Sequence, residues 1–481
     1  MTASQDETAM IPELYHPTST IRIPDQRSVP VTARLLEVID HPLFQRLRRV
    51  RQLGPIYLVY PGAVHTRFEH SLGVYDLARQ YLLSLLRDPE VAGSLTEEDL
   101  VATLLGALLH DLGHYPFAHS LEALHHPGRD TPRHEDLFAR LLTGEFGGDA
   151  GHPTLAQVIE SRFGVDAQHV IEIVRRKPRE HARPERRLVA TVISSGIDAD
   201  KADYLERDSV HMGVSYGRNY DRARLLDSLC VHPDGDRIAV TDKGRICAEM
   251  FTFCRYTMFS EAYWHHTVRS VSAMVEAAFA DFQEHHSMEL PEFTQLLLSR
   301  TDDELLDYML RNVPESSPCA RLLGSMTGGH RDFYRRLLTL SRSREDERQQ
   351  VAWERIYHLN RAQSDELRLR LCDTLSRWLG VRVDPEWVII DTPPRDKDRV
   401  ETVDIVYGQG VRRASAPLPS VSRVVQGIAT DFVRVVKKIR VFVARPVRAQ
   451  VESRGLGAAQ ELLLDAILAY QPGPSAQQVL L

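Results

Sequence analysis

Cysteine is scarce in this sequence and follows no pattern. The 481 residues include five cysteines, an odd number without a CxxC pair: Cys230, Cys247, Cys254, Cys319 and Cys372. Disulfide frameworks and thiolate zinc sites need paired or closely spaced cysteines, so the sequence argues against both. A reducing compartment is the better fit, and we expect a cytoplasmic protein.

Long apolar runs and an excess of positive charge are also lacking. No uninterrupted apolar run has the length of a membrane helix, and the opening MTASQDETAM has neither the basic segment nor the apolar core of a signal peptide. The formal net charge is −7, which gives no general attraction to nucleic acid or to an anionic membrane. We therefore expect neither a membrane nor a nucleic acid as partner.

The sequence does have the balance of a folded globular protein, with 43% hydrophobic and 26% charged residues. Apolar residues at helical spacing predict helices at 31–53, 68–86, 97–109, 189–208, 221–229, 246–286, 291–312, 330–342 and 361–379. A loose amino-terminal arm contains an extended piece at 20–23, and a polar connection covers 125–134. Valine- and isoleucine-rich stretches predict strands at 387–390, 403–406 and 439–444.

These patterns divide the chain into four parts: an arm (1–30), a helical domain that carries the chemistry (31–300), a helical extension (301–380) and an α+β carboxy-terminal region (381–481). Residues 411–450 hold nine lysines or arginines against one acid, Asp431. This basic strip is compatible with two roles. It either faces phosphates or a partner subunit, or it is a solvated face.

Histidine is concentrated between residues 65 and 134, which hold eight of the 21 histidines. His110 and Asp111 end an apolar segment, VATLLGALL, that should lie in the core, where a charged aspartate is costly unless it meets a cation or hydrogen-bond donors. His70 lies on a separate helical stretch whose apolar residues should face the same interior. Two imidazoles and a carboxylate in a core indicate a metal site.

A further anionic ligand is available in the segment IDADKADYLERD, residues 197–208. Asp200, Asp203 or Tyr204, and Asp208 recur at helical spacing, so part of this face can point into one cleft. Two histidines with two carboxylates suit iron, manganese, zinc or nickel better than metals that select thiolates.

Five ordered motifs carry a resemblance to a known family. They are RFEH at 67–70, HDLGH at 110–114, PFAH at 116–119, HE at 134–135 and DxDKxDY at 198–204. The sequence resembles the HD superfamily and, more closely, the catalytic core of its deoxynucleoside triphosphate triphosphohydrolases, without the SAM domain of some members. The similarity runs from about residue 34 to about 269, with a weaker part at 380–450. It implies a mainly α fold, with an HD helical core and a smaller α+β carboxy-terminal region.

The resemblance also implies roles for individual residues. It implies that one divalent ion (iron, manganese, zinc, nickel or magnesium) is held on the α-phosphate and the attacking water by His70, His110, Asp111 and Asp200. A second magnesium ion on the triphosphate is left open. The implied catalytic cluster comprises His114, His119, Glu122 and His134, where the family often has aspartate in place of Glu122.

The implied substrate contacts fall into three groups. Arg67, Lys201 and Arg255 resemble the residues that grip the triphosphate. Gln52 and Asp208 resemble the pair that binds the 3′-hydroxyl, and Tyr204 the ring that crowds a 2′-hydroxyl. Tyr263 and His265 resemble the residues around the base.

Regulation by nucleotides is a further implied property. Asp40, Gln45 and Arg48 match positions that bind an activating guanine nucleotide between subunits in tetrameric relatives, so a homo-oligomer, either a dimer or a tetramer, is expected. The family's DPIHG turn is replaced by IPDQRS at 23–28, which speaks against activation by dGTP. Asp40 and Arg48 could also form a simple ion pair.

The resemblance therefore implies metal-dependent hydrolysis of a deoxynucleoside triphosphate (dNTP) to the deoxynucleoside and inorganic triphosphate. Two alternatives remain open. An HD phosphatase or phosphodiesterase acting on another nucleotide would keep the four ligands without needing Gln52, Tyr204 and Asp208 together. A catalytically silent nucleotide-sensing HD protein would not need an intact ligand set and histidine cluster.

Overall fold

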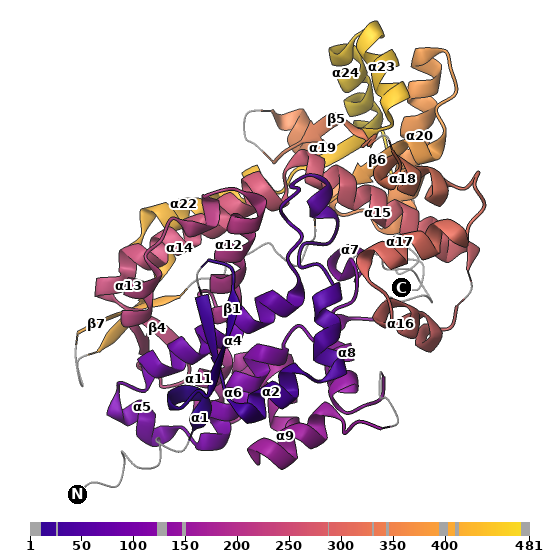
Figure 1. Cartoon of the computed structure of the whole chain (residues 1–481). Coiled ribbons are helices and arrows are strands. Elements are labelled where there is room, and N and C mark those ends of the chain that lie inside the picture. The colour runs from indigo at the N-terminus through magenta and orange to yellow at the C-terminus, as the bar shows by residue number, and fades with distance from the viewer. Residues whose placement is uncertain are drawn as a thin grey trace, which may run out of the picture.

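The structure is a computed structural model that describes residues 11–25, 27–122, 132–146, 151–286, 288–329, 331–342, 346–393, 403–408 and 413–472. Helices dominate it, and small sheets lie among them (Figure 1). The expected fold class is confirmed. Most of the predicted polar connection at 125–134 lies outside the described residues. None of the helices described is long and apolar enough to cross a membrane.

The amino-terminal residues that the structure describes are packed against the core. They form α1 (Pro12–Tyr15) and an antiparallel hairpin of β1 (Ser19–Ile23) and β2 (Arg27–Val31). Ile11 and Leu14 are almost fully buried, and Arg79 donates hydrogen bonds to the backbone carbonyls of Glu13 and Leu14. The predicted extended piece is present, but the prediction of a loose arm is wrong from residue 11 onward.

The continuous helix predicted over 31–53 is broken into α2 (Ala33–Ile39), α3 (Pro42–Gln45) and a 3₁₀ helix, η2 (Arg46–Arg49). Pro42 explains the break, because the residue before a proline disfavours the helical conformation and His41 is extended, with φ −62° and ψ 135°. A second 3₁₀ helix, η3 (Gly54–Leu58), follows. The segment 46–58 is therefore a series of short turns, and it carries Gln52.

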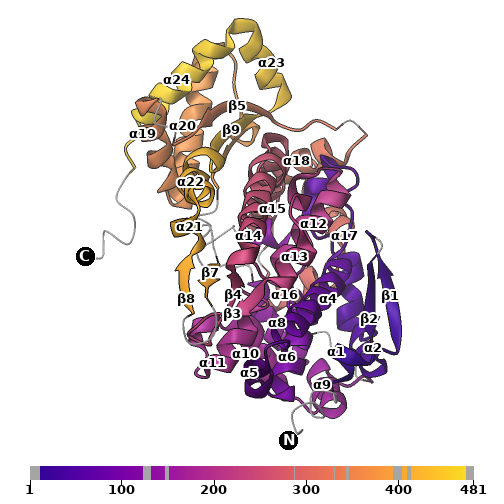
Figure 2. The same cartoon turned by 90° about the vertical axis from the view of Figure 1, so that its left-hand side faces the viewer.

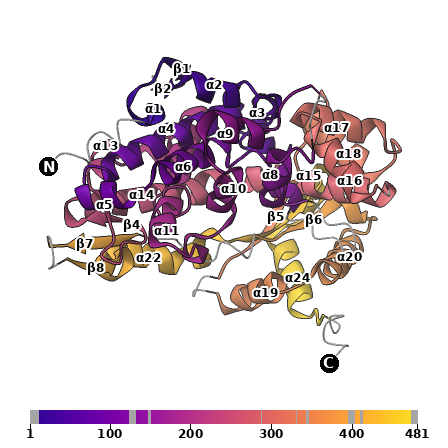
Figure 3. The same cartoon turned by 90° about the horizontal axis from the view of Figure 1, so that it is seen from below.

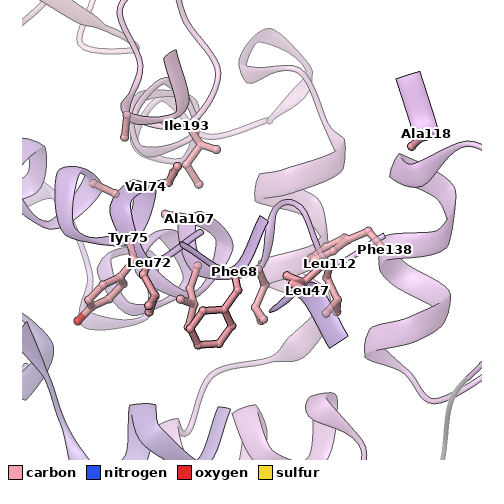
Figure 4. Packing of buried hydrophobic residues seen from close by; sticks show 14 of the residues in the cluster. Leu47, Phe68, Leu72, Val74, Tyr75, Ala107, Leu112, Ala118, Phe138 and Ile193 are labelled. Carbon is pink, nitrogen blue, oxygen red and sulfur yellow. The ribbon is translucent and has the colours of Figure 1, made fainter. Parts of the chain in front are cut away.

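The helices that form the centre of the molecule are α4 (Arg67–Leu85), α5 (Pro89–Ser94), α6 (Glu97–Leu109), α7 (Ala118–Glu122), α8 (His134–Leu142), α9 (Leu155–Phe163), α10 (Ala167–Arg175), α11 (Pro184–Thr191) and α12 (Ala199–Met212). α4 packs between α6 and α12. Figure 4 shows Phe68 and Leu72 of α4 in one layer with Leu47 and Leu112, while Val74 lies towards Ala107 and Ile193. Because α4 is buried on nearly every side, its polar residues also lie in the interior.

Two further predicted helices are interrupted. The helix predicted over 189–208 is the end of α11 and the beginning of α12, because the side chain of Asp198 caps α12 by accepting the backbone N–H of Lys201 at 2.7 Å. The helix predicted over 246–286 is α14 (Arg245–Thr257), a π-helical turn, η7 (Met258–Tyr263), and α15 (His266–His285). These breaks place Asp200 in the first turn of α12 and Tyr263 at the end of the π turn.

The remaining helices are α13 (Arg222–Asp227), α16 (Leu290–Leu298), α17 (Asp302–Arg311), α18 (Pro318–Thr327), α19 (Glu347–Tyr357), α20 (Arg361–Leu379), α21 (Leu418–Val421), α22 (Arg423–Asp431), the π-helical η10 (Phe432–Val436), α23 (Arg445–Arg454) and α24 (Leu456–Leu468). α19, α20, α23 and α24 gather around a second apolar core at one end of the molecule (Figure 2). The predicted helix at 361–379 coincides with α20, whereas the one predicted at 291–312 is two helices, α16 and α17.

Two sheets join distant parts of the chain. One has the order β3 (Leu229–Val231), β4 (Ile238–Thr241), β7 (Asp404–Tyr407) and β8 (Ala414–Pro417), and the other has the order β5 (Arg335–Leu340), β9 (Ile439–Val443) and β6 (Val388–Asp391). Seen from below, β7 and β8 lie at one end of the molecule and β5 and β6 at the other (Figure 3). The strands predicted near 387–390, 403–406 and 439–444 are present as β6, β7 and β9. The domain boundaries at 300 and 380 stay a prediction. The pairing of β4 with β7 spans both of them, and the pairing of β5 with β9 spans the one at 380.

The helix predicted at 330–342 is wrong, because this segment forms β5. Its leucines have no clear period, and pairing with β9 decides their conformation. The basic strip at 411–450 is also not a single face. Lys437 is fully buried and Arg440 is 6% exposed, while Arg413 donates to the carbonyl of Val231.

The first residues of α17 hold the segment 46–58 in place. Asp302 accepts the backbone N–H of Arg51 at 2.9 Å, and Asp303 accepts the guanidinium of Arg51 at 2.9 and 2.7 Å. The other carboxylate oxygen of Asp302 is buried and has no hydrogen-bond partner among the described residues. Because Gln52 follows Arg51 directly, α17 helps to fix the position of Gln52.

We expect Asp302→Asn to stabilise the protein at pH 7.5. Asp302 is 1% exposed, and burial raises its pKa to about 6, although the backbone N–H of Arg51 lowers it. The folded-state pKa lies above the unfolded value of about 3.9. The stability contributed by the neutral acid is therefore present at low pH and lost as the pH rises through about 6.

Asparagine keeps an acceptor for Arg51 without the buried charge. The gain in the free energy of unfolding should be about 1–3 kcal/mol at pH 7.5 and should vanish below about pH 4, as measured by urea titration. Asp303→Asn is the control, because its side chain is mostly exposed and hydrogen bonding to Arg51 lowers the pKa of its carboxyl group. Equal stability of Asp302→Asn and the wild type at pH 7.5 would contradict this account.

Candidate active site

Three helices bring together the four side chains expected to bind a metal. His70 lies in the first turn of α4, His110 and Asp111 follow α6, and Asp200 lies in the first turn of α12. Nε2 of His70 is 3.1 Å from Oδ1 of Asp200, and Nε2 of His110 is 3.8 Å from the same oxygen. Oδ1 of Asp111 is 3.4 Å from Nε2 of His110, and its Oδ2 is 3.9 Å from Nε2 of His70.

The geometry of these donors fits a divalent ion. Nε2 of His110 is buried without a hydrogen-bond partner in the described part of the chain, while its Nδ1 lies 2.9 Å from the carbonyl oxygen of Ala107. His70 donates its Nδ1–H to Asp203 at 3.0 Å, which leaves Nε2 as its ligand atom. His70, His110 and Asp200 lie close enough to hold one ion.

The electrostatics of the centre favour a cation. Burial alone would lower the pKa of His70, but hydrogen bonds to Asp200 and Asp203 raise it to about 10. Burial alone would raise the pKa of Asp111, yet Arg67 and then the neighbouring imidazoles hold it well below its usual range. Ionised carboxylates therefore surround the two imidazole nitrogens, and a divalent ion would compensate their charge.

A second group of possible ligands, His232, Asp234 and Asp236, lies in the β3–β4 turn. Arg237 donates to Asp234 at 3.1 Å and to Asp236 at 2.7 Å, and its guanidinium also lies 2.8 Å from Nε2 of His232. The carboxylates of this group are thus already paired with the guanidinium group of Arg237, which makes a metal site here less favourable.

The predicted catalytic histidines form a cluster beside the centre. Nδ1 of His114 is 3.2 Å from Oδ1 of Asp111, and its ring centroid is 3.8 Å from that of His134 and 5.2 Å from that of His119. His134 donates its Nδ1–H and its backbone N–H to Glu122 at 2.8 and 2.7 Å. Burial, and then Arg67 and His134, lower the pKa of His114 well below its usual value, so this ring is neutral.

The three cations predicted to bind the triphosphate differ in their surroundings. Arg67 is buried and donates to Oδ2 of Asp111 at 2.7 Å, next to the metal ligands. Lys201 is 2.7 Å from Asp198, the capping residue of α12. Nη1 of Arg255, on α14, is buried without a hydrogen-bond partner in the described ranges.

Of the residues predicted to bind the sugar, Tyr204 and Asp208 lie farther along α12, and Gln52 lies in the segment 46–58. Tyr263 donates its hydroxyl to Oδ2 of Asp208 at 2.5 Å, and His65 donates Nε2–H to Oδ1 at 2.8 Å. The rings of Tyr204 and Tyr263 meet edge to face, 6.3 Å apart. Oε1 of Gln52 is buried and lacks a hydrogen-bond partner within the described residues. An acceptor and a carboxylate are therefore available for a ligand hydroxyl.

His265 lies at a different place, because it caps α15 and its ring is tilted by 45° against that of His266, with the centroids 4.3 Å apart. Its pKa is lowered by burial and then by Arg440, which donates to the carbonyl of Trp264. A role of His265 at the base stays a prediction.

The three residues predicted to bind an effector lie on α2, α3 and η2. Arg48 donates to the side chain of Gln45 at 2.7 Å and covers the ring of Phe68 at 3.5 Å. Asp40 is exposed at the end of α2, and no ion pair between Asp40 and Arg48 is present in the described structure. Their proposed role stays a prediction.

Three residues to which the sequence assigned no role in the site contact it. Asp203 orients His70, His65 orients Asp208, and Arg46 donates to the carbonyls of Leu112 and His114 at 2.6 and 2.8 Å. Asp203 lies within the DxDKxDY motif and His65 lies two residues before RFEH, and these positions were the available signal. Arg46 follows Gln45 in a strongly basic segment and gave no signal of its own.

Matches to two family models show which family of proteins this chain belongs to. The model of the HD domain matches residues 67–208, and the model of the HD associated region matches residues 220–465, which is half of the chain. The chain belongs to the HD-domain family. The resemblance noted in the motifs is thereby confirmed, and HD domains imply a divalent metal ion.

Individual relatives are similar over about half of the chain. An uncharacterized protein of Bacillus subtilis is 36% identical over 52% of this chain and 53% of its own length. The deoxynucleoside triphosphate triphosphohydrolase SAMHD1 of Homo sapiens is 31% identical over 51% of this chain and 41% of its own length. The chain thus spans about half the length of the curated relatives it matches.

Solved structures share the fold. A hypothetical protein from Aquifex aeolicus has a TM-score of 0.64 at 24% identity, over 92% of this chain and 99% of its own. A phosphohydrolase from Bacteroides thetaiotaomicron has a TM-score of 0.61 at 22% identity, over 89% and 100%.

We expect Gly73→Ala to weaken metal binding. A Cβ at Gly73 would lie 2.0 Å from Oδ1 of Asp203 and 2.3 Å from Nη2 of Arg207, so Asp203 would have to move away from His70. A tenfold or larger loss of Mn²⁺ affinity is expected, since partners that orient metal ligands typically contribute about 10–100-fold. Isothermal titration calorimetry measures it.

Gly93→Ala in α5 is the matched control, because a Cβ there meets no atom within 4 Å. It should bind Mn²⁺ as the wild type does. Unchanged affinity in Gly73→Ala would show that α4 and α12 tolerate a wider spacing than this structure has.

Proposed function

We propose that the chain hydrolyses deoxynucleoside triphosphates to the deoxynucleoside and inorganic triphosphate in a metal-dependent reaction. The observation that carries the proposal is the arrangement along α12, where the ligand candidate Asp200 and the sugar-binding candidates Tyr204 and Asp208 follow one another on one helix. Relatives named as deoxynucleoside triphosphate triphosphohydrolases support it.

The proposed ligands of the divalent ion (iron, manganese, zinc, nickel or magnesium) are His70, His110, Asp111 and Asp200. When bound, the ion would neutralise charge on the α-phosphate and lower the pKa of a water molecule. Arg67 holds the Asp111 carboxylate and presents its remaining N–H groups to the phosphate. With Lys201 and Arg255, three cationic side chains are available to bind the triphosphate. The planar guanidinium groups of the two arginines suit phosphate oxygens. A second magnesium ion on the triphosphate is left open.

The histidine cluster would handle the proton that the departing sugar oxygen needs. Glu122 accepts the Nδ1–H of His134, so Nε2 is the atom of His134 that can exchange a proton. His114 is neutral and packs against His134, which leaves His119 and His134 as the donors to the leaving oxygen. Glu122 keeps the ring orientation that this transfer requires.

The sugar end would select deoxyribose. Asp208 has both carboxylate oxygens occupied by His65 and Tyr263, so its position is fixed before a ligand arrives. Gln52 would offer its Oε1, which has no partner among the described residues, to a 3′-hydroxyl, and the ring of Tyr204 would crowd a 2′-hydroxyl. A site that pairs one hydroxyl and excludes another discriminates between sugars.

The same contacts give less support to the two alternative functions. A phosphatase or phosphodiesterase for another nucleotide would leave the Asp208–Tyr263 contact without a purpose. A catalytically silent nucleotide sensor would not need His134 oriented by Glu122. A homo-oligomer, dimer or tetramer, with Asp40, Gln45 and Arg48 at an effector site remains part of the proposal, and light scattering with and without dNTP tests it.

We expect His110→Ala and Asp111→Ala each to abolish metal binding and activity while leaving the fold intact. Neighbouring residues cannot replace a ligand, whereas a large helical core tolerates a local cavity. Metal content by mass spectrometry and circular dichroism measure the two properties. His358→Ala, a change at an exposed residue at the end of α19, is the control, and retained metal in both ligand variants would refute the ligand assignment.

We expect dATP to be cleaved faster than ATP by a factor on the order of a thousand. Incubating the metal-loaded protein with each dNTP and NTP, followed by chromatography of the products, tests the reaction itself. Tyr204→Ala should reduce the discrimination by admitting ribose, with little change in metal content. Similar rates on ATP and dATP in the wild type would favour the first alternative.

A further inference from the structure

The amino-terminal hairpin reaches the candidate metal centre through one side chain. Arg27 is the first residue of β2, and its side chain is only 9% exposed. Nη1 donates to Oδ1 of Asp203 on α12 at 2.8 Å, and Nη2 donates to the carbonyl oxygen of Gly73 on α4 at 3.1 Å. The same Nη2 is 3.4 Å from the carboxylate of Asp76, also on α4.

Asp203 has all of its acceptor positions occupied. Oδ1 accepts Nη1 of Arg27 and Nη2 of Arg207, each at 2.8 Å. Oδ2 accepts Nε of Arg207 at 2.7 Å and Nδ1 of His70 at 3.0 Å. Since a carboxylate offers about four lone-pair sites, this group cannot rotate without losing a bond. The ring of His70 is therefore held with Nε2 towards Asp200.

The two arginines differ in what they connect. Arg207 lies four residues after Asp203 on α12, and it also donates to Glu69 on α4. Arg27 comes from a separate segment and bonds to α12 and α4 at once. Together with Arg207, it thus fixes the spacing between the helix that carries His70 and the helix that carries Asp200.

We propose that Arg27 is a positioning residue for the metal centre, acting on His70 through Asp203 and on the spacing of α4 and α12 through Gly73. This inference rests on the metal centre of the proposed function but not on its substrate. Glycine at position 73 is part of the arrangement, because any side chain there would occupy the place of Asp203 and Arg207.

The balance of charges around Asp203 is a second reason to assign Arg27 a positioning role. Arg27 and Arg207 face three acids in this part of the interior, Asp203, Asp76 and Glu69. Removing Arg27 leaves Asp203 and Asp76 short of a cation in a buried place, where an uncompensated charge is costly. Asp203 also loses one of the four hydrogen bonds that keep its carboxylate from rotating, so its contact with His70 is less firmly held.

The test compares Arg27→Met, Arg27→Gln and Arg27→Lys with Arg22→Ala. Arg22 is an exposed residue of β1 in the same hairpin and opposes Ser28, so its removal controls for general effects on the hairpin. Mn²⁺ and Zn²⁺ are titrated calorimetrically into each protein without nucleotide, and thermal unfolding is followed without metal. Only variants that are folded by circular dichroism are compared.

We expect Arg27→Met and Arg27→Gln to lose about 10–100-fold in Mn²⁺ affinity. Arg27→Lys should lose less because it keeps the charge at Asp203, and Arg22→Ala should match the wild type. Wild-type affinity in a folded Met or Gln variant overturns the inference. A destabilised hairpin with unchanged metal affinity overturns it as well, because it shows a purely structural role.

The outcomes separate this inference from the proposed reaction. A wild-type protein that binds Mn²⁺ but cleaves no dNTP refutes the reaction and leaves the Arg27 result valid. A wild-type protein that binds neither metal refutes the centre and this inference with it. Activity adds a further readout: with saturating Mn²⁺, the Lys variant should recover most of the wild-type kcat.

Discussion

The close contact between α4 and α12 is the constraint on which the site depends. The two helices approach so closely at Gly73 that a Cβ there would overlap Asp203. Asp200, Tyr204 and Asp208 follow one another along α12 at intervals of four residues. The register of α12 against α4 therefore sets both the metal geometry and the distance from the metal to the sugar end. A shift of one residue would disturb both ends together.

Buried polar groups also connect the two ends directly. His65, which orients Asp208, stacks on His211 with centroids 4.2 Å apart. His211 donates to Glu69 at 3.0 Å, and Glu69 accepts Arg207, the partner of Asp203. In a low-dielectric interior such a chain of hydrogen bonds strengthens its members mutually. His65 and His211 are joined by ring stacking and the other members by hydrogen bonds, so point mutations among these contacting groups should not be additive.

The sequence predicts which residues gather at the candidate site better than it predicts how distant segments of the chain pair and pack. His70, His110, Asp111 and Asp200 could be found because motifs mark them and because charged groups in apolar segments need partners. The helix 361–379 was predicted to the residue, since it has a cap and a clear apolar period. β5 was missed because its conformation depends on pairing with β9, about a hundred residues later. The orienting roles of Asp203 and Arg46 were not predicted, because contacts between helices leave no local pattern.

The pairing of β4 with β7 has a consequence for the order of assembly. Val240 pairs with Ile405, and Trp264 and Phe259 form an apolar cluster with Phe432. These contacts close very long loops, which makes them slow to form. A ribosome delivers all four candidate metal ligands well before it delivers residue 432. The part of the candidate site that carries Tyr263 is therefore completed last, after all four candidate metal ligands have been synthesised.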